Sequence, residues 1–292
     1  MASVERIETA LRRALDLAQG PGCPPQLAAA VRHAVFPGGA RIRPQLCLAV
    51  ARACGDDQPG LSDAAAVAIE LLHCASLVHD DLPCFDDAPT RRGQPSVHSA
   101  FGERLAVLAG DGLIVVAFQV LARAGLQTPM RLGPLLTTVS SAVGMPSGIV
   151  AGQAWECESR VSIREYQREK TGSLFTAATV AGAQAAGGDP VAWKPLGDCL
   201  GEAYQVADDI RDVVADPDEL GKPIGRDAAL GRPSVARERG LPAALRHFDA
   251  LMREAIAAVP ECPGAPFLRA MVRSESERLV PVQMVARLRA VA

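Results

Sequence analysis

Two groups of aspartates carry the strongest chemical signal in this chain. The first lies in residues 79–87, HDDLPCFDD, at the end of an apolar stretch, and the second in residues 204–212, YQVADDIRD, inside another. Carboxylate oxygens favour a hard cation such as magnesium, which keeps some of its waters and accepts oxygens from substrate phosphates. Two such groups could share one bridging diphosphate.

A diphosphate also requires cations from the protein. Asp208 and Asp212 share a helix face, about 5–6 Å apart at Cβ, so their repulsion needs compensation too. The candidate cations lie beside an aspartate group, a glycine or a helix break: Arg41, Arg43, Arg91, Arg92, Lys170 and Lys222. Alone, each would be an ordinary surface charge, and each aspartate group a solvated helix end. Their recurrence together favours phosphate binding.

Helices are expected to position these residues. Alanine and leucine dominate and apolar residues recur every three or four positions, which predicts an all-α fold of about ten helices. Three long helices carry the candidates. They are a helix over 62–79, capped by Ser62 and delivering Asp80; a helix opened by a capping box at 162–165, with Lys170 and Thr171 before Gly172; and a helix over about 196–214 with Asp208, Asp209 and Asp212.

The bulk composition narrows the class of protein. A chain of 292 residues with 49% hydrophobic side chains can bury one large core, so residues 1–292 are interpreted as a single domain. The net charge of -3 and the lack of a basic block argue against nucleic acid. Eight cysteines without a C-x-x-C pair indicate reduced thiols. The charged, amphipathic N-terminus resembles neither a signal peptide nor a membrane anchor, so a cytoplasmic protein is expected.

These motifs resemble those of the trans-isoprenyl diphosphate synthases, especially the short-chain geranylgeranyl diphosphate synthases of bacterial carotenoid pathways. The most specific match is DDLPCFD at 80–86 followed by Arg91-Arg92-Gly93. The second motif, usually Phe-Gln-x-x-Asp-Asp-x-x-Asp, is present at 204–212 with tyrosine first. Lys170-Thr171 and Gly221-Lys222-Pro223 match two further signatures. The resemblance covers most of the chain.

The resemblance implies a fold and an activity. The fold is an orthogonal helical bundle around a deep apolar cavity, usually in a homodimer. The activity is head-to-tail transfer of an allylic prenyl group to isopentenyl diphosphate, giving geranylgeranyl diphosphate. It requires magnesium, about three ions per active site, with manganese as a substitute. No side-chain nucleophile is needed, and the departing diphosphate can accept the proton.

The resemblance also implies a role for each motif residue. The metal ligands are Asp80, Asp86 and Asp208, with Asp81 and Asp212 in support. The allylic diphosphate binds Arg91, Lys170 and Lys222, and the isopentenyl diphosphate binds Arg43, His73 and Arg92. Gln205 and Thr171 lie near the reacting carbons. The residues implied in catalysis are therefore Asp80, Asp86, Lys170, Thr171, Gln205 and Asp208.

Three positions depart from the family pattern. Ala40 stands where a lysine usually binds isopentenyl diphosphate, so one cation is missing. Residues 231–234, GRPS, replace a common Lys-x-Thr, and Glu156 replaces a commoner aspartate. Both aspartate motifs remain whole, so an active enzyme with weaker isopentenyl affinity is expected.

Product length depends on the helix before Asp80. Members that stop at fifteen carbons typically have an aromatic residue five positions before the first aspartate, whereas this chain has Ala75 there and Ser76 next to it. A small residue would let the tail pass, giving twenty carbons, or Ala75 merely packs against a neighbouring helix. Farnesyl diphosphate synthase and a noncatalytic partner subunit stay open as alternatives. A class I terpene cyclase is disfavoured because His73 and Arg92 would then have no purpose.

Overall fold

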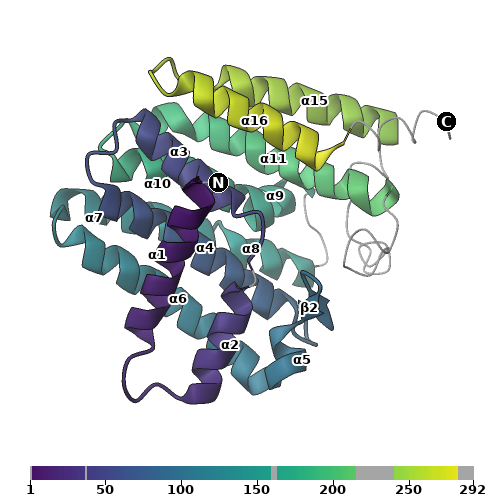
Figure 1. Ribbon diagram of the computed structural model, residues 1–292. Helices are drawn as coiled ribbons and strands as arrows, with labels where there is room; N and C mark the ends of the chain where they lie inside the picture. The colour runs from purple at the N-terminus through teal and green to yellow at the C-terminus, as the bar shows by residue number, and fades with distance from the viewer. Residues whose placement is uncertain (1, 37, 159–162, 215–239, 282–292) are drawn as a thin grey trace. The chain divides into compact units, whose positions relative to one another are not determined.

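The described part of the chain is almost entirely helical (Figure 1). The computed structural model describes residues 2–36, 38–158, 163–214 and 240–281. Thirteen α-helices lie in these residues, against about ten expected, because short helices of five or six residues follow the chain breaks. The all-α prediction is confirmed.

Two compact units make up the chain. The first is Met1–Ser140 with Ala181–Gly188, and the second is Ser141–Val180 with Asp189–Ala292. Each unit is described by itself below. The interpretation of 1–292 as one domain stays a prediction.

The first unit is organised around one buried helix. α4 (Pro59–Asp80) is buried along most of its length, and its alanines let neighbouring helices approach closely. It packs against α6 (Glu103–Gly125) and α3 (Ile42–Ala53), and against α1 (Ala2–Ala18) and α2 (Pro25–Val35). At the crossing of α4 and α6, a Cβ added to Gly110 would lie 2.1 Å from His79 Nε2. The glycine therefore permits the close contact that fixes the end of α4. The remaining helices here are α5 (Val97–Phe101) and α7 (Pro129–Val143), whose end extends into the second unit.

A small hairpin follows α4 and was not predicted. Strands β1 (Thr90–Arg91) and β2 (Gln94–Pro95) pair antiparallel. The two residues between them, Arg92 and Gly93, have φ of 54° and 75°, as required by the tight turn whose twist suits paired strands. The strands are too short for an alternating sequence pattern, so only the Arg-Gly pair could have signalled them.

The second unit is built on α11 (Pro190–Val214). α11 packs against α15 (Leu241–Ala257), and α15 against α16 (Ala265–Leu279); the three lie side by side in Figure 1. The other elements are α8 (Ile149–Ala154), the 3-10 turn η1 (Trp155–Cys157), α9 (Ile163–Gln167), the π-helical turn η2 (Arg168–Gly172) and α10 (Ser173–Ala185), which ends in the first unit.

Two predicted helix starts were wrong. α4 begins at Pro59, three residues before Ser62, because proline suits the first turn of a helix. Ser62 does not cap it; its hydroxyl donates to Asp56 Oδ1 at 2.6 Å. α11 begins at Pro190 rather than near 196 and continues through Pro195. In the predicted capping box, Ser162 lies outside the described residues.

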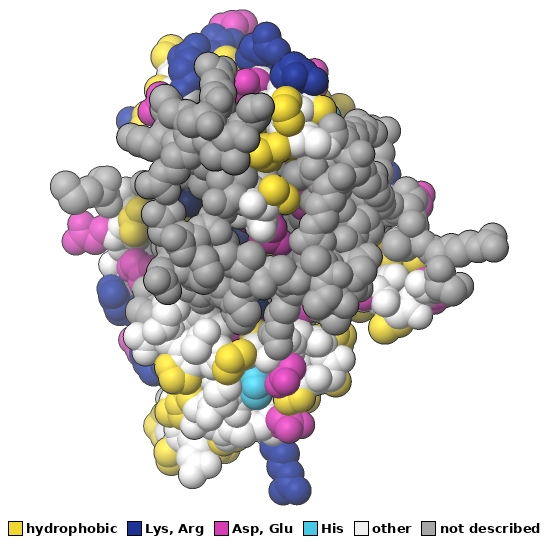
Figure 2. Space-filling model, turned by 90° about the vertical axis from the view of Figure 1, so that its right-hand side faces the viewer, with side chains coloured by type: hydrophobic (Ala, Val, Ile, Leu, Met, Phe, Trp, Pro, Cys, Tyr) yellow, Lys and Arg dark blue, Asp and Glu magenta, His cyan; other side chains and the backbone are white. Residues whose placement is uncertain are grey.

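Two helices are long and apolar enough to cross a membrane by length and composition alone. They are α4 and α6, with 78% and 33% of the respective 18-residue windows buried inside the protein. α4 therefore serves as a core helix. The surface in Figure 2 mixes acidic, basic and hydrophobic side chains among the described residues.

Candidate active site

The end of α4 brings Asp80 and Asp86 together. Pro83 cannot continue the helix, and the chain turns back so that the Asp86 N–H donates to the Asp80 carbonyl at 2.9 Å. Both side chains are half-buried, whereas Asp87 is exposed. The turn thus gathers two of the predicted metal ligands at one helix end.

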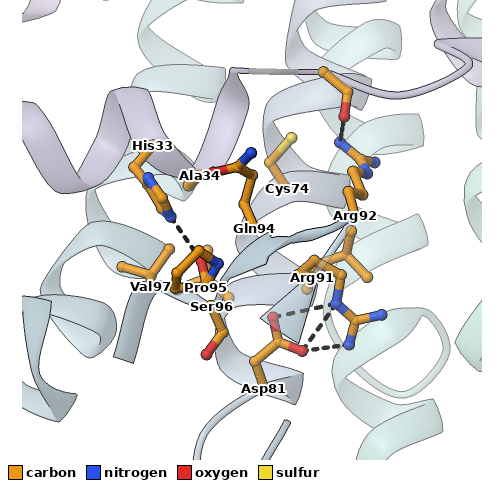
Figure 3. Close-up of a pocket in the computed structure, with 13 residues that line it drawn as sticks. His33, Ala34, Cys74, Asp81, Arg91, Arg92, Gln94, Pro95, Ser96 and Val97 are labelled. Atoms are coloured by element: carbon orange, nitrogen blue, oxygen red, sulfur yellow. Dashed lines mark hydrogen bonds and ion pairs between the residues drawn. The ribbon is translucent and has the colours of Figure 1, made fainter. Parts of the chain in front are cut away.

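Asp81 points to a different partner. Its carboxylate is 2% exposed, and both oxygens accept from Arg91 Nε, at 2.9 and 3.2 Å. Burial raises the pKa of Asp81, although the Arg91 guanidinium opposes that shift. The pair fixes the first strand of the hairpin to the end of α4 (Figure 3). In this structure Asp81 holds a predicted diphosphate ligand in place.

Arg92 lies over the glycine turn before α3. Its Nη1 donates to the Gly38 carbonyl, and a Cβ added to Gly39 would lie 2.8 Å from Arg92 Cζ. Gly38 has a φ of 86°, which glycine adopts readily. The two glycines therefore make room for Arg92 and supply its acceptor.

Arg43 and His73 meet across the first unit. Arg43 Nη1 lies 3.3 Å from His73 Nε2. Burial lowers the pKa of His73 well below its ordinary value, and the charges of Arg43, Arg92 and Arg91 add to this. A neutral ring can accept a hydrogen bond from Arg43. The three residues predicted to bind isopentenyl diphosphate, Arg43, His73 and Arg92, are thus brought together.

Arg41 does not act as a diphosphate cation, contrary to its place among the candidates. Its side chain is 0% exposed and pairs with Glu8 and Glu70. The sequence alone could not show that Arg41 is buried in ion pairs while Arg43, two residues later, is a candidate to bind diphosphate. Arg41 precedes α3 with a left-handed backbone, φ 50°, whereas Arg43 lies in the first turn of the helix.

A pocket opens beside this cluster, between α2, α4 and the hairpin (Figure 3). Its walls include His33, Cys74, Leu77, Asp81, Arg91 and Arg92. The cavity volume is about 30 Å³, far below the roughly 300–1,000 Å³ of typical ligand sites. By itself this pocket holds a water-sized group.

In the second unit, Lys170 lies in the π-helical turn η2. Lys170 Nζ donates to Glu156 Oε1 at 2.6 Å, and the Tyr166 hydroxyl donates to the same oxygen at 2.6 Å. A Cβ added to Gly152 would lie 2.4 Å from the Lys170 backbone nitrogen. The glycine therefore lets α8 approach η2. Glu156, in the 3-10 turn η1 that follows α8, accepts the hydrogen bond from Lys170.

Thr171 and Gln205 join a partly buried chain of polar side chains. Thr171 Oγ1 donates to Gln205 Oε1 at 2.9 Å, and Gln205 Nε2 donates to Asp209 Oδ1 at 3.0 Å. Asp209 is 5% exposed and also accepts from Gln167 Nε2 at 3.3 Å. No role was predicted for Asp209 from the sequence. No local signal separates it from the exposed Asp208, because both lie between the buried Ala207 and Ile210.

The other aspartates of the second motif face outward or lie at the helix end. Asp208 is exposed and accepts from Arg211 Nη2 at 2.7 Å. Asp212 is half-buried, one turn further along α11. Arg211 supplies the compensating positive charge that the spacing predicted. Lys222 and residues 231–234 lie outside the described residues.

The donor set suits magnesium. Within the described ranges, no three His, Cys, Asp or Glu side chains cluster closely enough to hold a metal by themselves. Asp80 and Asp86 offer carboxylate oxygens at one helix end, and Asp208 and Asp212 at another. Magnesium is usually held by one or two carboxylates together with substrate phosphates. The residues present fit a metal that arrives with a diphosphate.

Comparison with known proteins agrees with this fold and chemistry. Residues 24–263 match the polyprenyl synthetase family. A geranylgeranyl diphosphate synthase from Cereibacter sphaeroides is 54% identical over 288 residues, covering 99% of this chain and 100% of the relative. A geranyltransferase structure from Legionella pneumophila has a TM-score of 0.82 and 27% identity, covering 95% of both chains. A geranyltransferase from Helicobacter pylori, solved with magnesium and isoprenyl diphosphate, has a TM-score of 0.78 and 27% identity, covering 94% of this chain and 97% of its own.

The all-α fold is thus of the isoprenoid synthase type. The chain belongs to the polyprenyl synthetase family. The predicted family resemblance is confirmed.

Proposed function

We propose that this chain is a geranylgeranyl diphosphate synthase, which joins isopentenyl diphosphate head to tail to an allylic diphosphate. The observation that carries the proposal is the 54% identity, over 99% of the chain, to a protein of that name. Both aspartate motifs are also whole. A noncatalytic subunit would be expected to lose one of them.

Magnesium is the proposed cofactor, about three ions per active site, with manganese as a substitute. Asp80, Asp86 and Asp208 would be its ligands, with Asp212 in support. Asp81 would contribute by holding Arg91. When bound, magnesium supplies positive charge to the departing diphosphate. Support comes from the carboxylate donor set and from the Helicobacter pylori relative, whose structure contains magnesium.

The protein's own cations complete the proposed diphosphate sites. Arg91, Lys170 and Lys222 would bind the allylic diphosphate, and Arg43, His73 and Arg92 the isopentenyl diphosphate. Arg91 is oriented by Asp81, and Lys170 by Glu156. Lys170 would exchange the Glu156 carboxylate for a phosphate oxygen. Arginine suits the isopentenyl diphosphate because its fork can donate two parallel hydrogen bonds.

The proposed chemical step is driven by positive charge around the departing diphosphate. The allylic C–O bond breaks as the diphosphate leaves, and the isopentenyl double bond attacks the allylic carbon. Thr171 and Gln205, near the reacting carbons, would face the developing positive charge with hydroxyl and amide oxygens. The new C–C bond leaves a positive charge on the isopentenyl unit, and a proton from the carbon beside that charge passes to the departed diphosphate, which forms the new double bond. Fixed charges and dipoles supply most of the rate enhancement in such a site.

Ala75 is the proposed determinant of product length. It is 1% exposed and one turn before His79, on the same face of α4. His79 contacts α6 through the Val107 carbonyl at 3.3 Å, so a larger side chain at 75 would enter the space beside α6. Farnesyl diphosphate synthase is the second candidate, because the two solved structures compared above are named geranyltransferases.

The proposed assembly is a homodimer in the cytoplasm, acting in carotenoid biosynthesis. α6 supports the dimer because its apolar side chains remain exposed, Leu108 at 52% and Val115 at 55%. These lie two turns apart on one face. A second copy could cover that face, and Leu108→Glu should then yield a monomer in sedimentation.

The proposed activity is tested by incubating the protein with magnesium, isopentenyl diphosphate and farnesyl diphosphate. Products are dephosphorylated and identified by mass. A twenty-carbon alcohol that disappears with chelator is expected, and Ala75→Phe should shift the products from shorter starters to fifteen carbons. Only fifteen-carbon product from shorter starters with the unaltered chain would favour the farnesyl alternative. No prenyl product from any allylic starter would refute the enzyme.

A further inference from the structure

Arg41 is anchored on three sides in the first unit. Its Nε donates to Glu8 Oε1 of α1 at 2.8 Å, its Nη1 to Glu70 Oε1 of α4 at 2.6 Å, and its Nη2 to the Val35 carbonyl at 2.7 Å. Glu70 is 2% exposed. A planar guanidinium matches three such acceptors better than lysine can. The residue therefore ties α1, the end of α2 and α4 to one point.

A second contact fixes the same segment from the other side. Gln45 Nε2 donates to the Ala40 carbonyl at 2.7 Å, and Ser3 of α1 donates to Gln45 Oε1 at 3.2 Å. α1 thus reaches the turn before α3 at two places, through Glu8 and through Ser3. The held segment, residues 38–43, carries the Gly38 carbonyl that receives Arg92 and ends at Arg43.

We infer that Arg41, held by α1, is a positioning residue that places Arg43 and Arg92 for isopentenyl diphosphate. The inference rests on the proposed function and deepens it. Ala40 removes the lysine of the family pattern, so the site relies on the placement of two arginines beside a neutral histidine. A displacement of a guanidinium by about 1 Å breaks a bidentate contact to phosphate. Among the described residues, the two cations proposed for the allylic diphosphate have other anchors, Asp81 for Arg91 and Glu156 for Lys170.

The test compares Michaelis constants for the two substrates. Arg41→Lys keeps the charge but cannot reach all three acceptors, so KM for isopentenyl diphosphate should rise about tenfold while KM for farnesyl diphosphate changes less than about twofold. Glu8→Gln and Gln45→Leu should give smaller rises of the same kind. The matched control is Arg6→Ala, because Arg6 ties α1 to Asp63 at 2.6 Å without touching the segment.

Thermal melting of each variant separates positioning from stability. The expected result is that Arg6→Ala lowers Tm but leaves both KM values unchanged, whereas Arg41→Lys moves the isopentenyl KM beyond any effect of lost Tm. Equal changes in both KM values, or an isopentenyl KM that follows Tm across all variants, would overturn the inference. Should Arg41→Lys not fold, Gln45→Leu and Glu8→Gln decide it by the same criterion. Failure of the unaltered chain to form prenyl product would instead reject the proposed function.

Discussion

The two units hold their functional side chains in different ways. In the first, Asp86 and Arg92 lie on turns and Arg91 ends a two-residue strand, and the three are placed by backbone carbonyls, glycines and one buried ion pair. In the second, Thr171 and Gln205 lie on helices and are placed by side chain to side chain hydrogen bonds. Activity should therefore be sensitive in the first unit to side chains added where glycine leaves room, and in the second unit to the loss of a hydrogen-bonding atom.

The largest effect is expected at the turn that ends α4. Asp86→Ala removes a carboxylate brought beside Asp80, so kcat should fall about 10³-fold because charge on the leaving diphosphate is no longer balanced. Steady-state assays at saturating magnesium measure it. Asp87→Ala is the matched control, since that side chain is 66% exposed. Equal losses at both positions would mean that the turn does not select Asp86.

A smaller effect is expected in the polar chain of the second unit. Asp209→Asn loses the charge that receives Gln205 and Gln167, and should lower kcat about 10-fold to 30-fold and the free energy of unfolding by about 1–3 kcal/mol. Kinetics and urea unfolding check both. Asp198→Asn on the same helix, at an exposed pair with Lys194, should change neither by much. Full activity of Asp209→Asn would show that Gln205 is held by other contacts.

Backbone space is tested at Gly39. In Gly39→Ala the new Cβ would meet the Arg92 guanidinium at 2.8 Å, and the flexible arginine must move away. KM for isopentenyl diphosphate should rise about fivefold with little change in Tm. Gly112→Ala has open space around its Cβ and should leave KM unchanged. An unchanged KM for isopentenyl diphosphate in Gly39→Ala would show that Arg92 does not contribute to binding of this substrate.

The smallest effect concerns pH. The pKa of His73 is lowered on folding, so the unfolded chain binds the proton more tightly. The free energy of unfolding should be highest above about pH 6.5, the ordinary histidine pKa, and should fall as pH drops from there toward the lowered value. Urea unfolding against pH measures this slope. His73→Gln should flatten it, and an unchanged slope in His73→Gln would place the titration elsewhere.

Much of this arrangement could be predicted from local sequence. Helix content, the two aspartate groups and the pairing of Asp208 with a nearby cation follow from periodicity and spacing. Arg41 and Asp209 could not be assigned in this way, because burial depends on contacts between distant residues such as Glu8 and Glu70. The Arg92-Gly93 turn was missed because its strands contain only two residues each.

The helix starts show a second limit. Ser62 and its acidic neighbour satisfied a local capping rule, yet Pro59 began the helix and Ser62 bonded to Asp56. Similarly, the helix expected from about residue 196 begins at Pro190 and passes through Pro195. Local rules thus placed the helices in the right regions, while tertiary packing decided their ends.

The π turn at residues 168–172 can be understood as one residue more than a regular helix needs. Each residue in an α-helix advances the chain by about 100° of rotation. Deleting one residue there would permit a regular α-helix from α9 into α10. It would also rotate the side chains before the deletion by about 100° relative to those after it. Glu169, which now accepts from the Gly148 N–H at 2.7 Å, and Lys170, which now meets Glu156, could not then keep both partners. The extra residue thus shifts the helical phase so that Glu169 and Lys170 reach Gly148 and Glu156 at the same time.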